Sequence, residues 1–86
     1  MTINLSATIT QITEPKKLDD IFVTDITIER QNGKFTNHNL LKLFHKNEDH
    51  GIINNATYLF EVDLRGRKTK DGRVFNELKI MTIKEA

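Results

Sequence analysis

The segment TYLFEVDLRGRKTKDGRVFNELKIMTIK, residues 57–84, decides the fold. Apolar side chains occupy every second position from Tyr58 to Leu64, which is the pattern of a strand with one buried face. Asp71-Gly72 then predicts a tight turn, and a second apolar pattern follows it. The segment therefore predicts a hairpin of two long strands, Thr57–Arg67 and Arg73–Lys84.

Three further strands are predicted upstream of this hairpin, over Thr2–Thr10, Ile21–Arg30 and Lys34–Phe44. Asn32-Gly33 lies between the second and third strands and predicts a two-residue turn, because both residues tolerate positive φ. Residues 45–56 show no strand pattern and have room for at most one helical turn. Together the patterns predict five strands with a long gap between the third and the fourth.

The side chains on the inner faces of these strands form the predicted core. We assign Phe22, Tyr58 and Phe60 to it, because each shares a face with other apolar residues. In the last strand, Leu78 and Ile80 are expected on one face. The residues expected on its other face are Phe75, Lys79, Met81 and Ile83. Apolar residues on both faces indicate that a second copy covers the strand, so we expect a homodimer or small homo-oligomer.

Five strands in this arrangement predict an all-β protein that closes into a small barrel, because closure removes the exposed edges of the sheet. We expect a five-stranded barrel of the oligonucleotide/oligosaccharide-binding type (OB-fold) with little or no helix. An SH3-like barrel and an open meander sheet are the alternatives. The chain has 86 residues, which is enough for one small domain over residues 1–86.

Composition narrows the functional classes. The chain has no cysteine, so neither a disulfide framework nor a thiolate metal site is possible. No apolar run approaches the length of a membrane span, and the amino-terminal residues lack the pattern of a signal peptide. We expect a cytoplasmic protein.

The loop of the predicted hairpin concentrates positive charge. Residues 65–73 carry five of the 13 Lys and Arg residues but only one of the 12 Asp and Glu residues. The rest of the chain is therefore net negative. A phosphate backbone is the partner that such a cluster favours, whereas the alternative is a hairpin tip that simply stays solvated.

Two stretches around this loop, Val62–Arg67 and Lys70–Leu78, resemble the last hairpin of small bacterial and phage OB-fold proteins similar to single-stranded DNA-binding proteins. Leu41–Phe44 is similar to the end of the third strand in that family. The resemblance implies a sequence-tolerant single-stranded DNA-binding protein that acts in replication, recombination or repair. It also implies a phage- or mobile-element-encoded protein, which would act in the host cytoplasm. The chain departs from the family in having no tryptophan.

A site for single-stranded nucleic acid needs cations for the backbone and aromatic faces for the bases. In an OB-fold the last hairpin and the second and third strands border one groove, so cations from both regions are expected to converge there. The predicted nucleic-acid-binding residues are Arg65, Arg67, Lys68, Lys70, Arg73, Lys34, Lys42, Phe35, Phe44 and Phe75.

We expect no catalytic residue, no metal site and no cofactor. The spacing of His45 and His50 matches no zinc-ligand motif, and no nucleotide-binding glycine loop is present. The alternative function is a protein–protein module that uses an OB-like barrel as a docking surface. Leu59, Met81 and Ile83, all predicted to point outward, favour that alternative.

Overall fold

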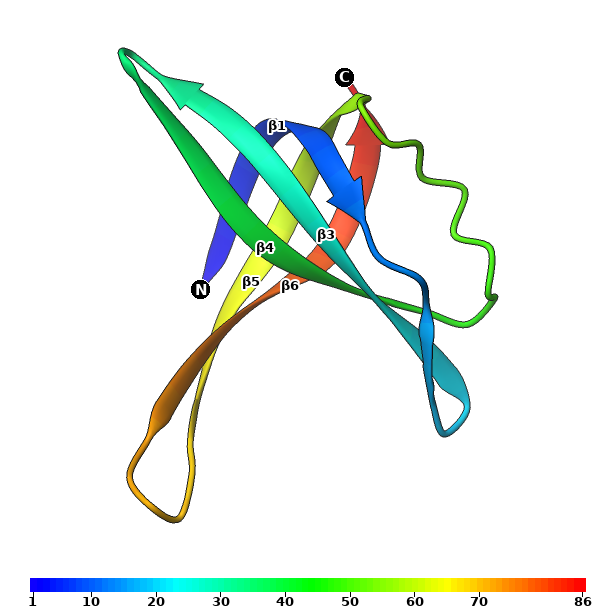
Figure 1. Ribbon diagram of the computed structural model, residues 1–86, viewed down its shortest axis with the longest axis vertical. Coiled ribbons are helices and arrows are strands. Elements are labelled where there is room, and N and C mark those ends of the chain that lie inside the picture. Colours follow the sequence, from blue (N-terminus) through cyan, green and yellow to red (C-terminus); the bar gives the residue numbers. More distant parts are fainter.

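The computed structural model describes residues 1–86 and contains six strands and no helix. The strands are β1 (Thr2–Ile12), β2 (Lys16–Leu18), β3 (Ile21–Asn32), β4 (Phe35–His45), β5 (Thr57–Lys68) and β6 (Val74–Glu85). Five of them follow the order β1-β5-β6-β4-β3, and pairing of β3 with β1 closes the barrel. This is the predicted five-stranded OB-like barrel (Figure 1). The chain has no helix of the kind that crosses a membrane.

The short strand β2 is an addition that the sequence pattern did not predict. Its three residues pair with β3, from Lys16 opposite Val23 to Leu18 opposite Ile21. Pro15 interrupts the chain just before it, so β2 is separate from β1. All three of its side chains are exposed, and β2 therefore adds an edge to the sheet rather than a layer to the core.

Closure depends on a bend in β1. Its first part, Thr2–Thr8, pairs with β5, and its second part, Thr8–Ile12, pairs with β3. The register shifts between Ile9 and Gln11. Such a bulge bends a strand and increases its twist, which allows β1 to pair with both β5 and β3 (Figure 1).

The other closing contact is short. Strands β4 and β6 run parallel and pair only at Lys42 and Lys79. Beyond this point they diverge, and the β5–β6 hairpin projects from the barrel as a separate arm (Figure 1). That arm remains paired throughout, as far as Lys68 opposite Val74.

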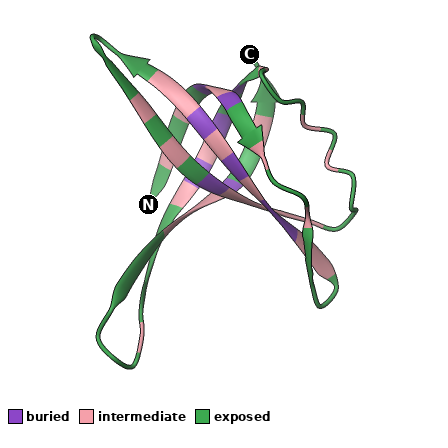
Figure 2. Cartoon of the chain, viewed as in Figure 1, coloured by how far each residue is buried: buried purple, intermediate pink, exposed green.

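The core fills the middle of the barrel and leaves the hairpin arms exposed, as Figure 2 shows. Tyr58 and Phe60 belong to it, at 7% and 2% exposed, which confirms their predicted role. Phe22 does not belong to it. Its ring stacks on His45 at 5.8 Å near the ends of β3 and β4, and it is half-buried. The core cluster consists of Ala7, Ile9, Ile26, Ile28, Leu41, Tyr58, Phe60, Val62 and Ile80.

The turn between β3 and β4 lies one residue later than predicted. Asn32 pairs with Phe35, so the two turn residues are Gly33 and Lys34. Only Gly33 has a positive φ, of 62°. A glycine at the first turn position with this sign of φ is the type II′ arrangement, which fits the twist of a hairpin as well as the predicted turn would.

The prediction that Ile83 points outward is wrong because β6 contains a bulge. The register shifts between Glu61 and Val62, where Met81 has no partner on β5. After the bulge, the alternation of faces is reversed, and Ile83 lies opposite Phe60 and packs against the core. Met81 remains 48% exposed.

Residues 46–56 form a loop in the place where many OB-folds have a helix. The loop is attached to the barrel by backbone hydrogen bonds: Asn55 donates to the Ile9 carbonyl at 2.8 Å, and Ile9 donates to the Ala56 carbonyl at 3.0 Å. The Tyr58 hydroxyl accepts a third bond from the Ile53 amide at 3.1 Å.

Candidate nucleic-acid interface

A groove of about 450 Å³ lies between β4 and the base of the β5–β6 arm. It forms where the two strands diverge after their single paired position. Its lining brings together four of the predicted site residues, Lys42, Arg65, Arg67 and Phe75. The remaining residues that line it are Leu40, Gly66, Asn76, Glu77 and Leu78.

Arg67 and Phe75 form the part of the groove that can meet both a phosphate and a base. They are direct partners on the β5–β6 ladder, so their side chains leave the sheet side by side. Phe75 is 47% exposed, and Arg67 is exposed and forms no ion pair. Both side chains are therefore accessible to a ligand in the groove.

Arg65 also lines the groove, but its charge is partly compensated. Its Nε atom donates to Asp63 at 2.9 Å. The amino-terminal ammonium group of Met1 lies 3.2 Å from the other oxygen of the same carboxylate. The hydrogen bond from Arg65, followed by that from the amino terminus, holds the pKa of Asp63 below its usual value. Arg65 thus contributes less free charge than Arg67.

Lys42 enters the groove from the β4 side and is similarly compensated. Its Nζ atom lies 2.8 Å from Asp25, the residue opposite it on β3. Both side chains are about one-third exposed or less, so the pair is only partly hydrated. Lys42 therefore forms part of the groove wall in a fixed position and contributes little free charge.

The hairpin tip beyond the groove carries the remaining cations of the charged loop. Gly72 has a φ of 89°, and its amide donates to the Thr69 carbonyl at 3.1 Å. Asp71 accepts from the Thr69 hydroxyl and from Arg73 Nε, the latter at 2.9 Å. These two hydrogen bonds, in that order, lower the pKa of Asp71. The tip is therefore an ordered turn in which Arg73 is paired.

Lys68 and Lys70 differ from Arg73 in forming no ion pair. Lys68 is exposed and Lys70 lies close to the tip of the arm. Together with Arg67 they place three uncompensated positive charges along the arm. The cationic run predicted from the sequence thus divides into three free cations and two paired ones.

Phe44 shares a face of β4 with Lys42, but its ring is already in contact with another side chain. Lys79 from β6 holds its Nζ atom 5.0 Å from the ring centroid, which is a cation–π contact. Phe44 is also half-buried. A base could stack on it only after Lys79 moved.

Lys34 and Phe35 are not near the groove. They lie at the tip of the β3–β4 hairpin, and Figure 1 shows this tip and the β5–β6 tip at opposite ends of the molecule. Phe35 is 75% exposed, so the ring is accessible, but it has no part in the same site. The expected convergence of these two residues with the charged hairpin is therefore not found.

Sequence reasoning missed Leu40 and Glu77 as groove residues. Leu40 is 54% exposed and lies on the same strand face as Lys42. That shared face was visible in the alternation of β4, but a leucine carries no signal of binding. Glu77 was missed because the groove exists only where β4 and β6 diverge, and no local sequence pattern predicts that divergence.

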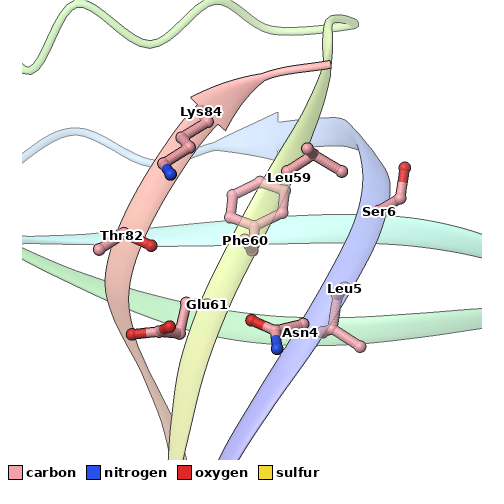
Figure 3. A pocket seen from close by; sticks show the side chains of 8 residues that line it. All are labelled: Asn4, Leu5, Ser6, Leu59, Phe60, Glu61, Thr82 and Lys84. Atoms are coloured by element: carbon pink, nitrogen blue, oxygen red, sulfur yellow. The ribbon is translucent and has the colours of Figure 1, made fainter.

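A second hollow lies on the outer face of β1, β5 and β6 (Figure 3). Its side chains lie in two cross-strand rows, with Ser6, Leu59 and Lys84 in one row. The other row consists of Asn4, Glu61 and Thr82. The rows mix polar, charged and apolar groups, so this face lacks the concentration of positive charge found on the arm.

The function of the groove is inferred from its geometry. No family model matches this chain. A search of curated proteins gives no match either.

Proposed function

We propose that this protein binds single-stranded nucleic acid with little dependence on sequence and serves DNA replication, recombination or repair in the cytoplasm of a bacterium or of a phage-infected host. The observation that carries the proposal is the pairing of an exposed Phe75 with an uncompensated Arg67 in one groove of an OB-like barrel. This is the combination of aromatic face and cation that such binding requires.

Single-stranded substrates fit this arrangement better than a duplex. A base that stacks on Phe75 must offer an open face, which a base inside a duplex does not have. Stacking on one aromatic side chain contributes about 1–3 kcal/mol per base. The apolar side chain of Leu40, which is 54% exposed, extends the surface on which a base can rest.

The arrangement of free charges supports a backbone path along the arm. Arg67, Lys68 and Lys70 follow one another towards the hairpin tip and lack ion pairs. A single strand whose base rests on Phe75 would carry its neighbouring phosphate past Arg67, the partner of Phe75 on the ladder, and on towards Lys70 at the tip. Lys68 projects from the other face of β5 and adds to the positive potential of the arm. Because such contacts release counterions, binding should weaken steeply as salt is added.

The proposal is tested by titrating a fluorescently labelled oligo-dT and a hairpin duplex of equal length into the protein. We expect the single strand to bind and the duplex to bind more weakly at the same salt concentration. Equal binding of the two would show a purely electrostatic interaction and would remove the role assigned to Phe75.

The second candidate function is a protein–protein interaction module, a subunit or inhibitor that docks through the barrel without binding nucleic acid. A second copy of the chain, in the homodimer expected from the sequence, is the partner that is simplest to test. It is favoured by Leu59 and Met81, which are 46% and 48% exposed on β5 and β6. Light scattering at several concentrations measures whether the protein is a dimer. The variant Leu59→Asp tests whether the exposed residues of β5 form the dimer interface. A mass of twice 10.0 kDa that falls to the monomer value in the variant would support this interface.

A further inference from the structure

Glu77 is an exception within the cationic groove. It lines the groove together with Lys42, Arg65 and Arg67, and it is the single acidic residue of that lining. Its carboxylate forms neither an ion pair nor a hydrogen bond. Arg65, its partner across the ladder, directs its Nε atom to Asp63 instead.

A free carboxylate in this position repels phosphate. The nucleic-acid backbone is therefore expected to follow the arm from Arg67 towards the hairpin tip, away from Glu77. The groove beside Glu77 is left for the base. The wall of the groove on β4 agrees with this division, because Leu40 is apolar and 54% exposed.

The spacing along β6 places Glu77 beside a stacked base. Phe75 and Glu77 are two residues apart on one strand, so their side chains project from the same face about 7 Å apart. A base whose face rests on the Phe75 ring would turn one edge towards the Glu77 carboxylate. That edge must supply hydrogen-bond donors, because an ionised carboxylate only accepts.

Guanine is the base whose edge fits a carboxylate best. Its N1–H and N2–H groups point the same way and match the two carboxylate oxygens in a charge-assisted, bidentate contact. Thymine offers one N–H group between two carbonyl oxygens, which the carboxylate repels. Adenine and cytosine each offer an amino group beside an unprotonated ring nitrogen, so they make one such bond at most.

We propose that Glu77 gives the groove a preference for guanine over thymine at the base that stacks on Phe75. The inference rests on the proposed single-strand binding and refines it, because most of the contact remains independent of sequence. Glu77 acts as the residue that determines specificity, whereas Phe75 and the free cations supply the affinity.

The test compares three labelled oligonucleotides: oligo-dT, the same strand with isolated guanines at every third position, and the same strand with inosine in place of guanine. Inosine keeps N1–H but lacks the N2 amino group. Lithium buffer prevents guanine quadruplexes. We expect the guanine strand to bind about fivefold or more tightly than oligo-dT, and inosine to lose most of that advantage.

Glu77→Gln should remove the preference and also strengthen binding to oligo-dT, because the repulsion between the carboxylate and phosphate is gone. Glu61→Gln is the matched control, since Glu61 is also half-buried but lines the separate hollow of Figure 3. It should leave the ratio unchanged.

The possible failures are distinguishable. If all three strands bind the wild-type protein equally, or if Glu77→Gln leaves the guanine-to-thymine ratio as it was, the base preference is wrong and single-strand binding stands. If none of the strands binds at low salt, the proposed function fails and the preference fails with it.

Discussion

Arg67 and Phe75 lie directly opposite each other on the β5–β6 ladder, and both are open to solvent. This relationship places a free guanidinium group beside a free aromatic face at the edge of a groove. A phosphate and the adjacent base of a single strand can therefore be bound by neighbouring side chains of one hairpin. Substitution of each residue tests its contribution separately.

Phe75→Ala should weaken binding of oligo-dT by about 1–3 kcal/mol, the contribution of one stacked base. Fluorescence anisotropy measures the change. Phe35→Ala is the control, because Phe35 is a more exposed phenylalanine at the opposite hairpin tip. An equal loss in both variants would show that the groove is not the place where bases stack.

Arg67→Glu should weaken binding to all sequences alike and reduce the dependence of affinity on salt. Removal of one phosphate contact changes the slope of log K against log salt by about 0.7 for a single strand. Lys84→Glu makes the same change of charge on the hollow of Figure 3 and should have a much smaller effect. Identical slopes for wild type and Arg67→Glu would place the phosphate contacts elsewhere.

Gly72→Ala should lower the free energy of unfolding by about 1–2 kcal/mol, because φ at Gly72 is 89° and alanine is strained there. The space around Gly72 is open, so the effect is one of backbone conformation alone. Gly66→Ala is the control. A Cβ atom there would lie 3.7 Å from Asn76 Oδ1, which is an ordinary contact, and φ is not positive. Chemical denaturation of both variants gives the comparison.

Acid should destabilise the loop that follows β4. Burial, followed by repulsion from His45, lowers the pKa of His50 below 6.5, although Asp49 partly opposes the shift. The Ile52 amide donates to His50 Nδ1 at 3.1 Å, and a proton on that nitrogen breaks the bond. Since the unfolded chain takes up the proton first, stability is complete above pH 6.5 and is lost as the pH falls through the lowered value.

Thermal melts between about pH 7.5 and pH 5 measure this effect. His50→Asn has no titrating group and should show a smaller fall in Tm over that range. His45 and Glu85 line the same hollow and are unchanged in the variant. A fall in Tm as large as that of the wild type would show that His50 is not the source of the effect.

The fold was predictable because its signals are local. Alternation at Tyr58, Phe60 and Val62 predicted the buried face of β5, and the structure confirms it. The bulges were not predictable, because an extra residue is placed by pairing with a neighbouring strand and leaves no mark in the pattern. One such bulge, at Met81, turned Ile83 from the predicted outer face to the core.

The candidate site was predictable only in part. The cations of the last hairpin were visible as a run of charge, but the pairing of Arg65 and Arg73 with nearby carboxylates depends on the folded geometry. Lys79 covers Phe44 from another strand, which no local pattern indicates. Of the three candidate aromatics, only Phe75 lines the groove that forms where β4 and β6 diverge.

The most direct test of the central claim is a titration of labelled oligo-dT into the wild-type protein at about 50 mM and about 200 mM salt. We predict saturable binding at the lower concentration and a loss of roughly tenfold or more at the higher one, as about two to three phosphate contacts require. Absence of binding at about 50 mM salt would contradict the assignment of this groove to single-stranded nucleic acid.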